Sequence, residues 1–176
     1  MKKQISAIAL SCIIASTFII SACSKGSSSH SSARGGSFKM KLDGVLKEYD
    51  TCYGSGFNQT LNPNLTYYQV NFHGGRPGDY CGVYANDVSP IKKGTYTSAI
   101  NPATNLPGAG LGAYRPAGTS DIYISYQSGW PLYDISITIL DLTSDHIKGT
   151  FYGKLRLIGG DKVYDVTEGE FEYYNN

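Results

Sequence analysis

Alternation of apolar and polar residues with a period of two is the feature that most constrains the fold of this 176-residue chain. Ile135, Ile137 and Ile139, for example, are separated by hydroxyl-bearing residues. Further segments of this kind are 38–42, 68–72, 80–88, 122–125, 147–157 and 163–167. Successive side chains of a strand point to opposite faces, so the pattern predicts strands with one buried face. Because no window shows the 3.6-residue periodicity of an amphipathic helix, the sequence predicts an all-β fold.

Turn residues divide these segments. Asp43-Gly44 stands between the apolar runs 38–42 and 45–49, which is the strongest short-range signal for a hairpin. The Pro- and Gly-rich segment 101–120 is predicted to be a long connection, and the Asn- and Gly-rich residues between 49 and 68 a second one. Residues 163–167 and 170–174 are predicted to be the final two strands. Short strands separated by such turns are typical of an antiparallel β-sandwich, with a partly closed β-barrel as the alternative. We expect one β-domain over residues 37–176.

The N-terminus has the layout of a secretory signal. Lys2 and Lys3 precede the apolar stretch 5–20, and small residues follow it. That stretch is too short and too often interrupted by Ser and Thr to cross a membrane comfortably. We therefore expect residues 1–22 to be a signal peptide.

The end of this segment, Ile20-Ser21-Ala22-Cys23, resembles the lipobox of bacterial lipoproteins. The resemblance implies a diacylglycerol thioether on Cys23, cleavage before Cys23 and acylation of the new amino group. Several acyl chains would anchor the protein firmly to a membrane. The Ser- and Gly-rich residues that follow predict a flexible tether, so that 23–36 comprises the lipidated cysteine and its tether. Ser24 is not acidic, which in diderm bacteria favours the outer membrane within the cell envelope.

The four cysteines separate into three groups. Cys12 lies in the signal and Cys23 carries the lipid, which leaves Cys52 and Cys81. In an oxidising compartment this pair predicts one disulfide. A thiol nucleophile or a metal site is the alternative, but the pair lacks C-x-x-C spacing and we expect no metal and no cofactor.

Charge and motifs argue against several function classes. The chain has 15 Lys+Arg against 14 Asp+Glu, so it lacks the basic excess of a nucleic-acid-binding protein. Neither H-E-x-x-H nor G-x-S-x-G is present. Glu170 and Glu172 alternate with Phe171 and predict a solvated strand face, and His146 is expected to be structural or exposed. We therefore expect a protein that is not an enzyme.

Aromatic residues give the predicted ligand site. Tyr114, Arg115, Trp130 and Tyr133 lie in or beside the long connection and the turn at 127–132. Exposed aromatic rings on loops stack on sugars or anchor a protein partner. The alternative is that these rings are strand residues that cover the ends of the core.

Four short segments occur in an order that resembles a family of small Bacteroidetes-type lipoproteins of unknown function. They are 38–44, 93–96, 147–151 and 168–171. The resemblance implies a compact antiparallel β-domain presented from the envelope, and it transfers no catalytic residue. The expected function is a membrane-anchored module that binds a glycan or an envelope protein. A structural subunit of an envelope assembly is the alternative, and a hydrolase is a more distant one.

Overall fold

The computed structural model describes residues 35–49, 51–62, 65–76, 79–126 and 133–174. Within these ranges all helix or strand elements are β-strands, and none is a helix. The strands are β1 (Gly36–Leu42), β2 (Val45–Tyr49), β3 (Cys52–Asn62), β4 (Leu65–Arg76), β5 (Asp79–Asp87), β6 (Gly94–Thr97), β7 (Ile100–Asn101), β8 (Leu106–Pro107), β9 (Ala109–Arg115), β10 (Tyr123–Ile124), β11 (Ser136–Leu142), β12 (His146–Leu157) and β13 (Val163–Tyr174). The signal, most of the tether, Cys23 and Trp130 lie outside the described residues.

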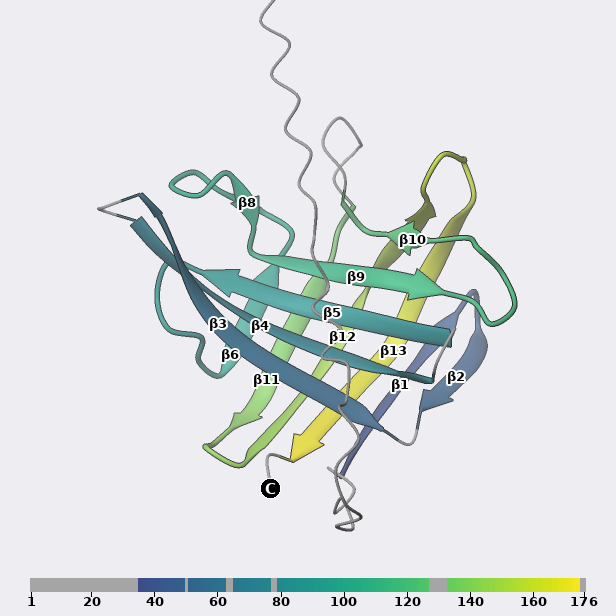
Figure 1. Ribbon diagram of the computed structural model, residues 1–176, viewed down its shortest axis with the longest axis horizontal. Helices are drawn as coiled ribbons and strands as arrows, with labels where there is room; N and C mark the ends of the chain where they lie inside the picture. The colour runs from purple at the N-terminus through teal and green to yellow at the C-terminus, as the bar shows by residue number, and fades with distance from the viewer. Residues whose placement is uncertain (1–34, 50, 63–64, 77–78, 127–132, 175–176) are drawn as a thin grey trace, which may run out of the picture. The chain divides into compact units, whose positions relative to one another are not determined.

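The main sheet is antiparallel and has the order β2-β1-β13-β12-β10-β9-β5-β4-β3, with β11 and β6 continuing from β12 on a second path. Figure 1 shows β3, β4, β5 and β9 in front of β1, β11, β12 and β13. We call the first group the front sheet, and the second group, with β2 and β6, the back sheet. Both are parts of the one main sheet. The all-β prediction is confirmed, and the nearly closed sheet corresponds to the barrel alternative rather than to two separate sheets.

Strand β12 joins the two sheets because different halves of it have different neighbours. Its first half pairs with β11, where Tyr152 lies opposite Ser136, and its end pairs with β10, where Arg156 lies opposite Ile124. Gly153 lies between these halves, and a Cβ atom there would be 2.7 Å from Cγ1 of Ile135. A residue without a side chain is therefore needed where β12 crosses the core.

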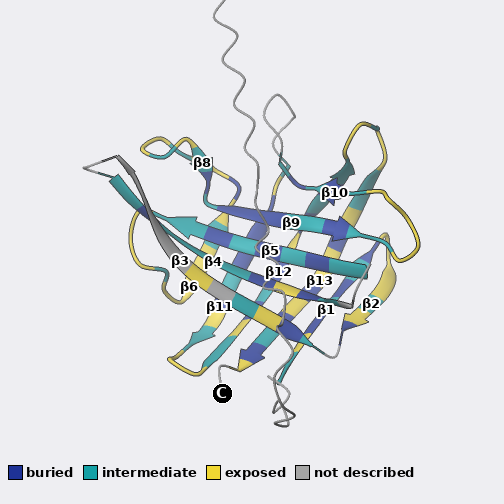
Figure 2. Ribbon diagram, in the orientation of Figure 1, coloured by how far each residue is buried: buried dark blue, intermediate teal, exposed yellow. Residues whose placement is uncertain are grey.

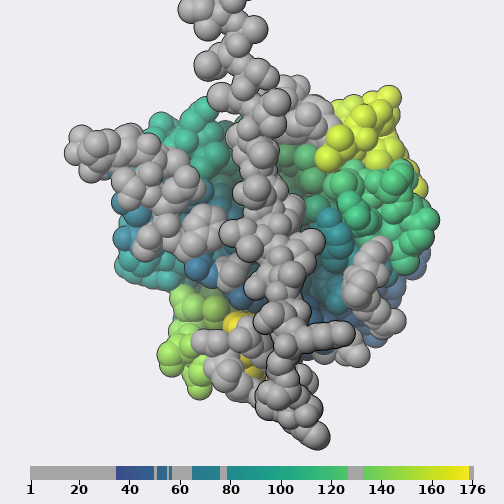
Figure 3. All heavy atoms as spheres, in the orientation of Figure 1, coloured from purple at the N-terminus to yellow at the C-terminus, as the bar shows by residue number. Residues whose placement is uncertain are grey.

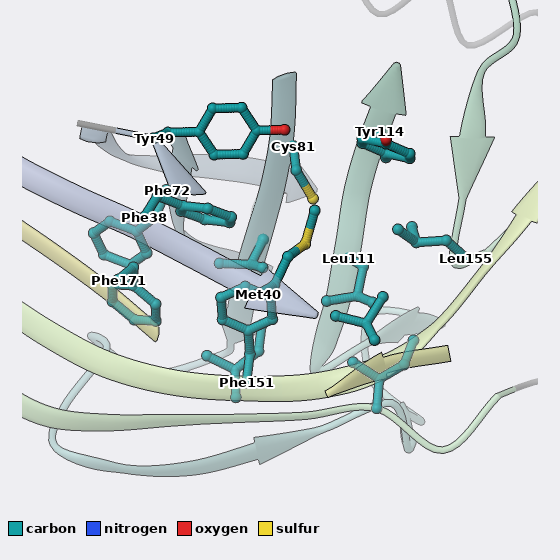
Figure 4. Packing of buried hydrophobic residues seen from close by; sticks show 14 of the residues in the cluster. Phe38, Met40, Tyr49, Phe72, Cys81, Leu111, Tyr114, Phe151, Leu155 and Phe171 are labelled. Carbon is teal, nitrogen blue, oxygen red and sulfur yellow. The ribbon is translucent and has the colours of Figure 1, made fainter. Parts of the chain in front are cut away.

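The core lies between the two sheets and consists mostly of aromatic and branched side chains (Figure 4). Phe72 of the front sheet stacks on Phe171 of the back sheet with a centroid distance of 4.3 Å and an interplanar angle of 12°. Phe38 and Phe151 extend this aromatic group, with centroids 5.1 Å apart. Because Phe171 is buried and Glu170 exposed, the predicted orientation of the last strand is confirmed.

Burial alternates along β5 of the front sheet, as Figure 2 shows. In β5, Cys81, Val83 and Ala85 are buried, while the residues between them are partly exposed. The inward residues face the core, so the intervening ones form the outer surface of the front sheet.

Three expectations about strand limits are wrong. The segment 101–120 contains β7, β8 and β9 instead of a continuous connection, and 52–62 forms β3. The predicted strands 163–167 and 170–174 are one strand, β13. In β9 the outward position between Ala109 and Leu111 is a glycine, so the polar half of the alternation is missing from the sequence.

The loops at one end of the domain support each other. The turn after β12 lies beside the connection from β9 to β10, at the upper right of the space-filling view (Figure 3). There the backbone N–H of Ile158 donates to the carbonyl of Ile122 at 2.9 Å. This contact fixes the β12–β13 turn against the end of the front sheet.

Candidate functional site

The predicted aromatic site does not form as a surface cluster of the described residues. Tyr114 is only 2% exposed, and its ring contacts Tyr123 and Tyr164 with centroid distances of 5.9 and 6.0 Å. Tyr133 is half-buried and packs against the core. A ring enclosed by other rings is not available to a ligand, so Tyr114 is a core residue. Of the predicted set, Arg115 lies on the outer surface, in a partly exposed position.

The predicted disulfide is also wrong in this structure, where Cys52 and Cys81 are free, buried thiols. Cys52 lies opposite Gly74, and Gly74 lies opposite Cys81 on the next strand. The two Cα atoms are therefore two strand spacings apart, roughly 9–10 Å, whereas a disulfide rarely joins Cα atoms more than about 7 Å apart. Phe38 fills the place between them, since a Cβ atom on Gly74 would be 2.3 Å from the Cβ of Phe38.

The thiols are expected to be unreactive in the folded protein. Burial raises the pKa of the Cys52 thiol to about 12 and raises the pKa of the Cys81 thiol further. Iodoacetamide should leave both residues unlabelled in buffer and alkylate both in urea without any reductant, as peptide mapping by mass spectrometry would show. Labelling in urea only after reduction would instead establish the disulfide.

A polar cluster surrounds His146 at the start of β12. Its Nδ1 lies 3.1 Å from Oδ2 of Asp141, and its Nε2 lies 3.0 Å from Oε1 of Glu172. The ring stacks on Tyr174, whose hydroxyl donates to the same Glu172 oxygen. Lys93 forms a second ion pair with Asp141 at 2.6 Å. His146 thereby links β11 to the end of β13.

This cluster is suited to bracing rather than to catalysis. Both ring nitrogens of His146 are engaged by carboxylates, so neither is available to take a proton from a substrate. Asp145 accepts a hydrogen bond from Thr143 within the turn. Among the described residues, no group of three His, Cys, Asp or Glu side chains is arranged to hold a metal ion.

The bracing by His146 should depend on pH. Hydrogen bonds to Glu172, and to a smaller extent to Asp141, raise the pKa of His146. The contribution of His146 to the free energy of unfolding is therefore complete below its unfolded pKa of about 6.5, and it is lost as the pH rises through the raised pKa. Hydrogen bonds from Lys93, and to a smaller extent from His146, lower the pKa of Asp141 to about 2. The contribution of the Asp141 carboxylate to stability is therefore lost only in strong acid.

We therefore expect His146→Gln to lower the melting temperature most near pH 5.5 and least near pH 9. Thermal unfolding of both proteins across this range tests the expectation, with Lys47→Gln as the control, because Lys47 lies on β2, which pairs with β1 and not with the strands of this cluster. A difference from wild type that does not change with pH would contradict it.

A small pocket lies beside the β7–β8 hairpin, lined by Tyr67, Asn86, Asn101 and Leu106 among others. It has room for about one water molecule. Oδ1 of Asn86 is buried there and has no hydrogen-bond partner among the described residues, whereas its Nδ2 donates to the Pro107 carbonyl. A single water would satisfy this oxygen, so we assign the pocket no larger ligand.

The outer surfaces of the two sheets differ sharply in charge. Every ion pair between described residues joins side chains of the back sheet or of the loops at its ends. These pairs are Lys39–Glu170, Lys41–Glu168, Lys93–Asp141, His146–Asp141, His146–Glu172, Lys154–Asp165 and Arg156–Asp161. The back sheet is therefore a solvated, salt-bridged surface, which is the ordinary condition of an outer strand face.

The outer surface of the front sheet instead carries aromatic and amide side chains around a glycine. Gly82 of β5 lies opposite His73 of β4, and His73 lies opposite Tyr53 of β3. Tyr80 and Tyr84 flank Gly82 along its own strand. We call these five residues, with Asn71 opposite Tyr84, the aromatic face.

The rings of the aromatic face lie close to the sheet. Tyr53 is 48% exposed and stacks on His73 with an interplanar angle of 27°. Tyr84 extends across Gly110 of β9, where a Cβ atom would be 2.2 Å from its hydroxyl oxygen. Burial raises the pKa of Tyr84 to about 12, so this hydroxyl remains a hydrogen-bond donor at neutral pH. Asn71 is held by a hydrogen bond from Gln69.

The sequence of β5 contains a partial signal for the aromatic face. Residues 80–84 read Tyr-Cys-Gly-Val-Tyr, in which the aromatic residues and the glycine share one face and the small apolar residues share the other. The alternation alone does not say that the tyrosines point outward, because both sets are apolar. The pairing of β5 with β4 and β9 decides the orientation, and β9 lies in the segment predicted to be a connection.

No helix of the described residues is long and apolar enough to cross a membrane. No protein-family model, curated protein or solved structure matches the chain, so the resemblance to Bacteroidetes-type lipoproteins stays a prediction.

Proposed function

We propose that the chain is a lipid-anchored glycan-binding module of the cell envelope, which binds its ligand on the aromatic face. The observation that supports this most is the contrast between the two outer surfaces. Aromatic and amide groups gather around Gly82, whereas the ion pairs occupy the back sheet. Sugar rings present C–H groups that stack on aromatic faces and hydroxyl groups that exchange hydrogen bonds with amides.

A protein partner is the alternative ligand, but the exposed aliphatic residues do not lie on the aromatic face. Val45 and Leu46 are on the edge strand β2, Leu140 is on β11, and Ile158 is in the β12–β13 turn. Protein interfaces generally bury apolar anchors at their centre. Gly82 at the centre of the aromatic face exposes backbone without a side chain. This suits the close approach of a sugar ring better than it suits the apolar anchor side chain of a protein partner.

The test is a thermal shift of the purified protein against oligosaccharides of cellulose, mannan, xylan, chitin and polygalacturonate. A ligand at a hundred times its dissociation constant adds about 2.7 kcal/mol, which is roughly 5–10 °C for a domain of this size. Tyr53→Ala should abolish the shift, whereas Tyr152→Ala, on the back sheet, should preserve it. The control is matched because Tyr53 and Tyr152 are 48% and 50% exposed. Absence of any shift would favour the protein partner.

The anchor has its own test. In cells that process lipoproteins, Cys23→Ala should move the protein from the membrane fraction to the soluble or uncleaved fraction, because no acyl chain would be attached. Fractionation with immunoblotting measures this, and Ser24→Ala is the matched control. Retention of the Cys23 variant in the membrane as cleaved protein would contradict lipid anchoring.

A further inference from the structure

Arg115 stands at the margin of the aromatic face. It is the last residue of β9 and lies opposite Tyr80. Its guanidinium carbon is 5.8 Å from the centroid of the Tyr80 ring. None of the carboxylates in the described ranges pairs with Arg115, and its Nε is buried without a hydrogen-bond acceptor there. The guanidinium is therefore supported by an aromatic ring rather than by an acidic side chain.

Among the described residues, neither carboxylate of the front strands forms an ion pair with Arg115. The carboxylates on its described strands belong to Asp79 and Asp87, at opposite ends of β5. Asp79 accepts a hydrogen bond of 2.9 Å from the hydroxyl of Tyr49, which is a core residue. Cations of the back sheet such as Lys39 and Lys154 each have a carboxylate partner. Arg115 thus lies on the outer surface where the described side chains form no ion pair.

A half-buried guanidinium is a favourable site for a carboxylate. It is weakly hydrated, and its planar fork matches the two oxygens of a carboxylate. Tyr80 and Gly82 are two residues apart on β5, which is roughly 7 Å. A sugar ring over Gly82 would therefore bring a carboxylate on its edge within reach of Arg115.

We propose that the aromatic face takes an acidic glycan whose sugars carry carboxylates, and that Arg115 binds the carboxylate. This inference rests on the proposed function and specifies the chemical class of its ligand.

The experiment compares polygalacturonate oligomers with their methyl esters, which keep the same sugar backbone without the charge. Titration calorimetry of the full-length protein should give at least tenfold tighter binding for the free acid. Arg115→Gln should weaken binding of the acid at least tenfold and change binding of the ester less than twofold. Arg115→Lys, which keeps the charge but loses the planar fork, should fall between wild type and Arg115→Gln.

Salt dependence gives a measurement that needs no variant. Binding of the acid should weaken as NaCl is raised from 50 to 500 mM, and binding of the ester should not. Equal binding of acid and ester, or tighter binding of a sulfated dextran than of polygalacturonate, would overturn the inference while leaving the glycan-binding function intact. Binding to none of these polymers, together with no shift in the glycan panel, would overturn both.

Discussion

Gly74→Ala is expected to destabilise the domain by about 2–3 kcal/mol, the cost of forcing extra volume into a well-filled core. The added methyl group would be 2.3 Å from Cβ and 2.6 Å from Cγ of Phe38. Phe38 is fully buried and cannot move away, because its ring contacts Tyr49 and Phe151. The glycine thus makes room for the aromatic group that joins the two sheets.

Gly82→Ala is the matched control for this prediction. Gly82 lies on the neighbouring strand but faces outward, and its added Cβ would meet nothing closer than 3.4 Å. We expect this variant to be as stable as wild type or more stable by about 0.5 kcal/mol, since alanine restricts the unfolded chain. Urea unfolding followed by tyrosine fluorescence measures both variants. Equal stability of the two would contradict the assigned orientation of β4 and β5.

Phe171→Ala is the second prediction with a large effect. Phe171 is 1% exposed, and its ring covers Phe72 across the two sheets at 4.3 Å. Truncating a buried phenylalanine typically costs about 3–5 kcal/mol, a large share of the total stability of a domain. We therefore expect the variant to be largely unfolded at low urea concentration.

The conservative change Phe171→Leu separates lost volume from lost aromatic contact. It keeps most of the buried apolar surface and should cost about 1–2 kcal/mol. Urea denaturation midpoints give both values. A loss below 1 kcal/mol for Phe171→Ala would show that Phe72 and Phe171 do not hold the sheets together.

Much of the fold could be predicted from the sequence wherever one face of a strand is apolar and the other polar. This is the case for β1, β11 and the end of β13, where Phe171 lies inside and Glu170 outside. Strand β2 was predicted from the Asp43-Gly44 turn instead. The prediction failed for β3 and β9, whose sequences contain glycine residues and, in β3, serine and amide residues that are typical of turns. In those strands long-range pairing with β4 and β5 outweighs local propensity.

The proposed ligand site on the aromatic face was harder to predict than the fold, for a related physical reason. Tyr114 and Tyr80 are both strand tyrosines, and nothing local shows that one faces the core and the other faces solvent. The β5–β9 register, which places Cys81 opposite Tyr114 and Tyr80 opposite Arg115, decides between them. Arg115 was included in the predicted site because it stands beside aromatic residues in the sequence, and its aromatic partner is Tyr80 rather than Tyr114.

The most direct test of the account is a glycan array probed with wild type and with Gly82→Val. The valine would raise a side chain in the middle of the aromatic face without entering the core, and Thr150→Val on the outer surface of β12 is its control. We predict that wild type and Thr150→Val bind the same glycans, and that Gly82→Val binds them at least tenfold more weakly while keeping the wild-type melting temperature. Undiminished binding by Gly82→Val would show that the ligand does not lie on this face.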